Sequence, residues 1–348
     1  MIERVMTTPA EIGDHAKAHA RWHWGEFAFW ISALACAFLF PSRYLIMTDI
    51  VRLALFALSL DLILGYAGIV SLGHAAFFGI GAYSAGLLAL HGIVTEPVVA
   101  LIVAGLVAMG SGFLTSFLVI RGVDLTRLMV TLGIALLLEA LAERFSNITG
   151  GTDGLQGIEM QPILKLFAFD LFGKVGFFYS LAVLFALFLL ARRIVHSPFG
   201  LSLRAIRNNP LRAAAIGIPV NKRLIAVYTL AAFYAGIAGA LFTQTTALAS
   251  LDVFSFERSA DLMLVLVIGG TGYLYGGLIG AVAFRMLQEV FSTITPQYWQ
   301  FWIGLVLVVI VLLGRGRLHR WALWGPNLII RQLGGRKAAV AVPEGDAP

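Results

Sequence analysis

Long apolar stretches, separated by short polar or glycine-rich breaks, fill most of this sequence between residues 27 and 313. A helix needs about 20 apolar residues to cross a bilayer, where it satisfies its backbone hydrogen bonds internally. The candidate stretches are Phe27 to Ile46, Thr48 to Leu64, Ala67 to Leu90, Pro97 to Ile120, Leu125 to Ala142, Phe177 to Ala191, Leu224 to Leu248, Ala260 to Leu287 and Trp299 to Leu313. The pattern predicts an all-α polytopic membrane protein with a bundle of about 8 to 10 transmembrane helices.

Charged residues are scarce and unevenly placed. Of 348 residues, 59% are hydrophobic and 13% are charged, about half of the roughly 25% found in an ordinary globular domain. The positive excess lies beside apolar stretches, in residues 192–223 and again from Arg315 onward. Lysine and arginine gather in this way on the cytoplasmic side of membrane proteins. We therefore expect contact with membrane lipid and no binding of nucleic acid.

The segment from Arg192 to Arg223 contains seven Lys or Arg and no Asp or Glu, which indicates a cytoplasmic loop. Six spans before it place the N-terminal tail, residues 1–26, in the cytoplasm as well. One candidate span, Phe177 to Ala191, separates residues 143–176 from this cytoplasmic loop, so we expect residues 143–176 to form an external loop. Two interpretations of this external loop remain open, a surface for an external partner and a flexible tether.

The apolar stretch Ala260 to Leu287 decides where the C-terminal tail lies. If this stretch is one span, the basic tail of residues 314–348 falls outside, against the usual charge bias. If its glycine-rich sequence GGTGYLYGG separates two helices, the tail returns to the cytoplasm, and the membrane domain covers residues 27–313. We predict this helix break. Its glycines are Gly269, Gly270, Gly272, Gly276 and Gly277.

Small residues recur at four-residue spacing within three spans. Tightly packed membrane helices place small residues where their backbones meet, so we interpret these residues as helix contact faces, with pathway lining as the alternative. Two longer stripes consist of Ala100, Ala104, Ala108, Gly112 and Ser116, and of Ala232, Gly236 and Ala240; the third is the pair Gly276 and Gly280.

The spans hold few ionisable groups, whereas proton- or sodium-coupled carriers usually need acids within the membrane. Asp61 and Glu139 are the main exceptions, and Asp61 either bonds a neighbouring helix or contacts substrate or an ion. The sequence contains no GxxxxGK[ST] phosphate loop and no HExxH zinc motif. We predict no catalytic site, no metal site and no bound cofactor. Because Cys36 is the only cysteine, no internal disulfide can form, and we expect its thiol to be buried.

The basic segment contains signals for a short helix. Asn209 and Pro210 suit a helix start, because Asn accepts bonds from free N–H groups and Pro fits the first position. Gly217 suits the helix end. A helix of about seven residues is not stable alone, so packing must hold it. Its Leu211 and Ile216 would fit a groove on a cytoplasmic partner, with contact to anionic headgroups as the alternative. The flanking basic residues are Arg204, Arg207 and Arg212.

Four motifs occur in an order that resembles one family of transporters. They are GYAGIVSLGHAAFFGIGAYSAG (residues 65–86), NITGGTDGLQGI (residues 147–158), SPFGLSLRAIRNNPLRAAAIGIPVNKRLIAVYTLAAFYAGIAGALF (residues 197–242) and GGTGYLYGGLIGA (residues 269–281). Together they resemble the permeases of ABC importers of the branched-chain amino acid type, the LivM group in particular. The resemblance extends from about Leu53 to Leu313.

The resemblance implies that an ATPase grips a coupling helix and that closure of two ATPases rocks two permeases to alternate access. The implied partners are a homologous LivH-like permease, two LivG/LivF-like ATPase subunits that hold ATP and magnesium, and a periplasmic amino acid-binding protein. The implied location is the bacterial inner membrane. The residues that fall in the coupling segment are Arg204, Arg207, Asn209, Pro210, Arg212, Ala213 and Gly217. Arg212 stands where related importers carry an acid, which leaves the exact contacts of the helix open.

The SLGH part of the first motif lies near the translocation path in the resemblance. The residues placed there are Ser71, Leu72, Gly73 and His74, together with Phe77 and Asp61. For His74 two interpretations remain open, a lining residue and a hydrogen-bonded packing residue.

The implied cargo is leucine, isoleucine or valine. Relatives that carry urea, short amides or aromatic acids supply the nearest alternatives. A secondary carrier or channel acting alone is a different class of function, and such a carrier does not require an acid-free basic segment of this length.

Overall fold

The computed structural model describes residues 24–313 except 123, 164–165 and 171. The predicted C-terminal tail and all but the last three residues of the N-terminal tail lie outside the described residues. The longer helices are α2 (Trp24–Leu39), α3 (Tyr44–Leu64), α4 (Ala75–Leu90), α5 (Pro97–Arg121), α6 (Asp124–Arg144), α8 (Lys174–Val195), α11 (Val220–Thr246), α12 (Phe256–Gly269), α13 (Leu274–Ile294) and α14 (Trp299–Leu313). The short helices are α7 (Ser146–Thr149), α9 (Pro198–Asn208) and α10 (Pro210–Ala215).

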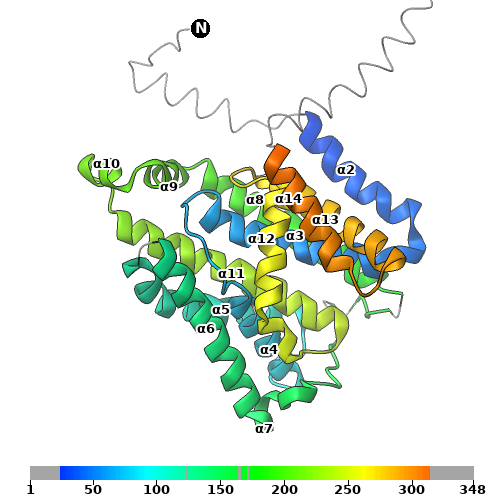
Figure 1. The fold of residues 1–348 in the computed structure, drawn as a ribbon. Coiled ribbons are helices and arrows are strands. Elements are labelled where there is room, and N and C mark those ends of the chain that lie inside the picture. The colour runs from blue at the N-terminus through cyan, green and yellow to red at the C-terminus, as the bar shows by residue number, and fades with distance from the viewer. Residues whose placement is uncertain (1–23, 123, 164–165, 171, 314–348) are drawn as a thin grey trace, which may run out of the picture. The chain divides into compact units, whose positions relative to one another are not determined.

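Every regular element in the described part of the chain is helical, apart from two isolated β-bridges (Figure 1). Five helices, α5, α6, α8, α11 and α13, are long and apolar enough to cross a membrane. Helices α2, α4 and α14 are apolar but shorter. The predicted all-α polytopic membrane fold is confirmed, and the chain is a multi-pass membrane protein.

Two predicted spans differ from the observed helices. The stretch Phe27 to Ile46 is divided, because Pro41 follows the end of α2 and begins a 3-10 turn, and a residue before proline avoids the helical conformation. The stretch from Ala67 begins its helix only at Ala75. Gly68 has a positive φ of 74°, and the Ile69 N–H bonds the Ile63 carbonyl at 2.9 Å. The turn closed by this hydrogen bond ends α3, and residues 65–74 lie outside any α-helix.

The described residues form two compact units, one up to Arg285 and one from Met286. Within the second unit, the rings of Phe291 on α13 and Trp302 on α14 stack at a centroid distance of 6.3 Å. In the first unit, α9 and α10 lie at one end and α7 lies at the opposite end (Figure 1). We call these the α10 end and the α7 end.

Helix α11 is the most enclosed candidate span of the first unit and packs against α3, α4 and α5. The alanine and glycine stripe of α5 is buried and meets α11, where a Cβ on Gly236 would collide with Ala108. On another face of α11, a Cβ on Gly81 of α4 would collide with the Gly236 backbone. The two stripes are therefore confirmed as helix contact faces, since only small residues allow such close approach.

The chain reverses direction between α12 and α13, at residues 270–273. Gly270 and Gly272 have positive φ values of 107° and 82°, a region that glycine adopts without strain. Beyond the turn, a Cβ on Gly269 would strike the carbonyl of Gly276, and one on Gly280 would strike the carbonyl of Val265. The two helices thus pack backbone against backbone.

The structure pairs charged residues of two helices and corrects one expectation, that of a buried Cys36. Arg285 of α13 bonds Asp49 of α3 at 2.8 Å. Asp49 also pairs with Arg52, as their i, i+3 spacing on α3 suggests. Cys36 is exposed on α2 and not buried, because the apolar residues of this helix face outward over most of its surface.

The close contact of α4 with α11 makes a testable prediction. Replacing Gly81 by Ala forces a methyl group into the Gly236 backbone, so we expect a loss of about 1–3 kcal/mol, as for other overpacked sites. Gly110→Ala on α5 is the matched control, because a Cβ there meets nothing within 4 Å. Thermal unfolding in detergent should show a lower midpoint for Gly81→Ala alone. Equal midpoints for both variants would contradict the packing.

Candidate functional site

The basic segment forms two short helices at the α10 end. Helix α9 runs from Pro198 to Asn208, and α10 follows after one residue, from Pro210 to Ala215. The Asn209 side chain accepts a hydrogen bond from the Arg212 N–H at 3.0 Å, as expected of an N-cap. Beyond α10, Gly217 has a φ of 87°, and the Ile218 N–H bonds the Ala213 carbonyl at 3.1 Å.

Helix α10 presents an apolar surface that nothing in the described chain covers. Leu211 is 82% exposed and Ile216 is 75% exposed, and Arg212 beside them is exposed as well. On the opposite side Ala213 is 2% exposed and fastens the helix to its neighbours. A six-residue helix is held by such packing and by its caps, since it has too few internal bonds to persist alone.

The arginines of α9 are exposed like Arg212, but both of them contact another segment of the chain. The Arg207 guanidinium donates a hydrogen bond to the carbonyl of Gly65, just beyond α3. The Arg204 guanidinium lies over the Tyr66 ring at 5.3 Å. Burial, followed by the charge of Asp61, raises the pKa of the Tyr66 phenol, so the ring stays neutral beneath the cation. Helix α9 is thereby tied to the end of α3.

A second tie joins the end of α3 to the turn between α12 and α13. Asp61 is 1% exposed, and its Oδ1 accepts a hydrogen bond from the Gly272 N–H at 2.7 Å. Gly272 also lies so close to Arg207 that a Cβ there would sit 2.9 Å from Nη1. We call Asp61, Gly65, Arg207 and Gly272 the junction. It connects three segments that are distant in the sequence.

The beginning of the basic segment is also held internally. Arg192 forms a partly buried ion pair with Glu26 of α2, and the Tyr275 hydroxyl donates to the same carboxylate at 2.9 Å. Sequence reasoning missed Glu26 and Tyr275, because no spacing rule links residues so far apart. A cavity of about 370 Å³ lies here, and its lining includes Glu26, Tyr66, Arg192, His196, Arg204 and Tyr275.

The SLGH residues lie deep within the first unit. His74 is 1% exposed and its Nε2 lies 2.8 Å from Ser59 Oγ. Its ring stacks on Phe56 at 5.7 Å and meets Phe77 edge-on at 5.8 Å. Within this chain, His74 is therefore a packed and hydrogen-bonded histidine.

The backbone around His74 is pinned to two other helices. The Leu72 N–H donates to Thr131 Oγ1 of α6 at 3.2 Å, and the Ala75 N–H donates to Ser259 Oγ of α12 at 3.0 Å. Gly73 lies against the Thr131 carbonyl, where a Cβ would not fit. Ser71 is fully buried, and its Oγ has no hydrogen-bond partner among the described residues. The structure therefore brings His74 of the SLGH segment together with Phe77 in one buried region, whereas Asp61 is buried at the junction.

No group of His, Cys, Asp and Glu able to hold a metal ion occurs among the described residues.

The fold and this site define a helical membrane protein with a short basic helix pair tied to its core. Residues 43–311 match the family described as "Branched-chain amino acid transport system / permease component". The match covers most of the sequence, so the chain belongs to this family.

Individual relatives agree with the family. The high-affinity branched-chain amino acid transport system permease protein LivM of Escherichia coli is 26% identical over 276 residues, covering 73% of this chain and 64% of the relative. The chain thus spans slightly less than two thirds of that relative's length. A probable branched-chain amino acid transport permease protein LivH of Methanocaldococcus jannaschii is 30% identical over 69% of this chain and 77% of the relative. The ribose import permease protein RbsC of Bacillus subtilis is 29% identical over 43% of this chain and 50% of the relative. No solved structure matches.

The junction predicts a specific role for Asp61. Asp61→Leu leaves the Gly272 N–H without its acceptor, and we expect a loss of about 1–3 kcal/mol. Asp61→Asn keeps an acceptor oxygen and should lose less. Hydrogen exchange at the Gly272 amide, measured beside thermal unfolding, should rise in the Leu variant. Unchanged exchange in that variant would show that the bond does not hold the turn.

Proposed function

We propose that this chain is a translocation subunit of an ABC importer for the branched-chain amino acids leucine, isoleucine and valine. It pairs with a homologous permease, is driven by two ATPase subunits and receives cargo from a periplasmic binding protein, in the bacterial inner membrane. The family and its LivM and LivH relatives support the transport class and the cargo. The hydrolysis of ATP with magnesium belongs to the partner subunits, because the sequence contains no phosphate-binding loop.

The observation that carries the proposal is the form of α10. Its exposed Leu211 and Ile216 stand beside Arg212 on a helix whose other face is anchored. Exposed apolar residues rimmed by charge are typical of a protein contact surface. A groove on an ATPase subunit would bury both apolar side chains and pair with the arginine.

The junction supplies a route from α10 into the membrane helices. A movement of α10 carries α9 with it, since only Asn209 separates them. Arg207 then transmits the displacement to the end of α3, and Asp61 passes it to the turn before α13. Coupling of this kind requires a contiguous physical connection between two sites, which these contacts provide.

Different residues therefore serve docking and transmission. Arg212 is exposed beside the apolar surface, whereas Arg207 is engaged with Gly65. A charge reversal at both positions together, the obvious test from sequence alone, would mix a docking defect with a break in the junction.

The first test is transport by the assembled complex. Vesicles that contain both permeases and the ATPases, supplied with the binding protein and ATP, should take up labelled leucine. Urea, benzoate and ribose in parallel reactions distinguish the other cargo classes, including that of the RbsC relative. Uptake of leucine without ATPases would instead indicate a carrier acting alone. Uptake of urea or benzoate in place of leucine would contradict the proposed cargo.

The docking surface gives a second prediction. Leu211→Glu places a carboxylate at the centre of the apolar surface, so we expect ATPase binding to weaken by at least about 10-fold, equivalent to 1.4 kcal/mol. The same charge added by Gln156→Glu, in the exposed loop before α8, should leave ATPase binding unchanged. Co-purification with the ATPases and ATP-driven uptake are the measurements. Normal binding by the Leu211 variant would exclude α10 as the docking helix.

A further inference from the structure

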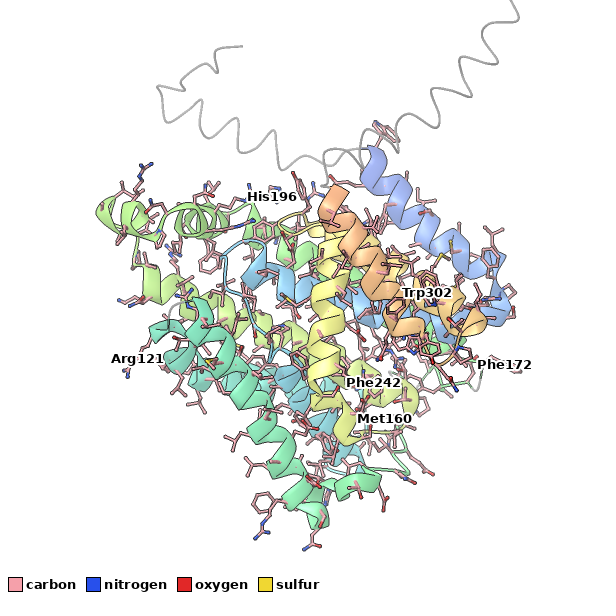
Figure 2. The ribbon with its side chains drawn as sticks, in the orientation of Figure 1. Arg121, Met160, Phe172, His196, Phe242 and Trp302 are labelled. Carbon is pink, nitrogen blue, oxygen red and sulfur yellow. The ribbon has the colours of Figure 1, made fainter. Side chains whose placement is uncertain are left out.

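A cavity of about 460 Å³ lies in the first unit, away from the junction. Its walls come from the start of α3, the start of α8, the end of α11 and the loop that precedes α8. Met160, which lines this cavity, and His196, near the α10 end, are labelled in Figure 2. The volume falls within the range of about 300–1,000 Å³ that is typical of small-molecule sites.

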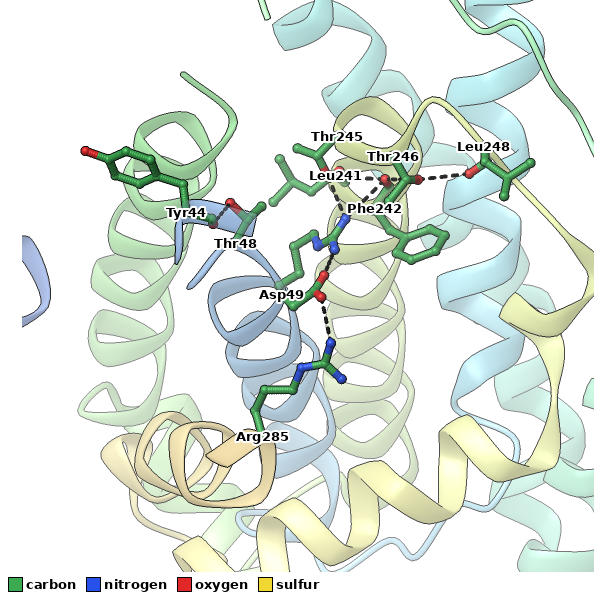
Figure 3. Close-up of polar contacts among 10 residues, drawn as sticks. Tyr44, Thr48, Asp49, Leu241, Phe242, Thr245, Thr246, Leu248 and Arg285 are labelled. Atoms are coloured by element: carbon green, nitrogen blue, oxygen red, sulfur yellow. Dashed lines mark hydrogen bonds and ion pairs between the residues drawn. The ribbon is translucent and has the colours of Figure 1, made fainter. Parts of the chain in front are cut away.

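A cationic group forms one side of the cavity. Arg52 is 7% exposed and pairs with Asp49, and its Nη1 donates to Thr245 Oγ1 at 2.5 Å and to the Phe242 carbonyl at 3.3 Å. Figure 3 shows that Asp49 is also bonded to Arg285, and that Thr245 lies on the other side of the Arg52 guanidinium. A guanidinium has five N–H donors, so these three contacts leave Arg52 able to bind a further acceptor, such as a carboxylate.

Acceptor groups form another part of the lining. Gln244 is 4% exposed, and its Nε2 donates to the Pro97 carbonyl at 2.8 Å, which orients the amide. Its Oε1 is buried and has no hydrogen-bond partner among the described residues. A buried acceptor without a donor is costly, and an ammonium group supplies donors. Asp170 adds a carboxylate that also caps the start of α8, through the Val175 N–H at 2.9 Å.

The rest of the lining includes apolar side chains suited to an aliphatic group. They are Leu45, Ile158, Met160 and Phe169.

We propose that this cavity binds a small aliphatic amino acid in its zwitterionic form. The ligand carboxylate meets Arg52, the ammonium meets Gln244 Oε1 and Asp170, and the side chain lies against the apolar lining. The cavity deepens the proposed function and rests on it, as a site for the cargo on this chain. A monocarboxylate leaves the Gln244 acceptor without a donor, and an amine leaves the Arg52 donors without an acceptor. Neutral urea carries no charge for either group.

The test is direct binding of labelled leucine to the full-length chain in lipid nanodiscs, up to millimolar concentration. Met160→Trp fills the cavity from its loop side and should weaken binding by at least about 10-fold. Met109→Trp is the matched control, because Met109 is exposed on α5 and is not part of the cavity lining. The analogues 4-methylpentanoate and 3-methylbutylamine each lack one charge and should compete at least about 10-fold less well than leucine.

Three results would overturn the proposal: no leucine binding by the natural sequence, equal binding by both tryptophan variants, or equal competition by either analogue. A second measurement, ATP-driven uptake by the whole complex, tests the proposed function independently of this binding site. Normal leucine uptake by Met160→Trp with unchanged binding contradicts the cavity and leaves the function intact. Leucine binding that is lost in Met160→Trp, without leucine uptake by any complex, supports the cavity and contradicts the function.

Discussion

The close approach of helix backbones around α11 is the constraint on which the rest of this structure depends. In lipid, apolar side chains gain nothing by leaving the hydrocarbon, so helices associate through tight packing and interhelical hydrogen bonds. Gly81 and Gly236 bring α4 onto α11, and Ala108 brings α5 to the same helix. The Thr243 hydroxyl then donates to the Ala82 carbonyl at 3.0 Å, and the Tyr234 hydroxyl reaches the Leu187 carbonyl on α8 at 3.0 Å. These hydrogen bonds are possible only because the helices are already in contact.

Charged groups take their places at the ends of this packed core. At the α10 end, Asp61 accepts a hydrogen bond from the Gly272 N–H, and Arg207 donates one to the Gly65 carbonyl. Both backbone groups lie just beyond the end of a helix. Elsewhere on α3, Asp49 and Arg52 lie beside a cavity, and Arg285 of α13 joins them. One helix, α3, therefore carries polar contacts near both of its ends, and its three charges keep it from being the uniformly apolar span that its length suggests. Ionisable residues within membrane helices usually mark functional positions. On α3, Asp61 stabilises the junction, whereas Asp49 and Arg52 line the cavity.

The sequence predicted the helical class and most of the helices because apolar length and small-residue spacing are local properties. It also placed the start of α10, since Asn209 and Pro210 act on their own neighbours. It could not predict the partners of Arg207 or Arg192, because these side chains reach Gly65 and Glu26, far away in the chain. Arg207 and Arg212 look alike in sequence and both are exposed in the structure, yet Arg207 donates to the Gly65 carbonyl whereas Arg212 stands beside the apolar surface of α10. The late start of α4 was also missed, because an apolar sequence such as AGIV does not show that its backbone must turn at Gly68.

The contact between α12 and α13 differs from the side-chain packing of an ordinary core. Gly269, Gly276 and Gly280 face backbone atoms of the neighbouring helix. The hairpin of α12 and α13 is thus packed so tightly that a methyl group at any of these three glycines would force the two backbones apart.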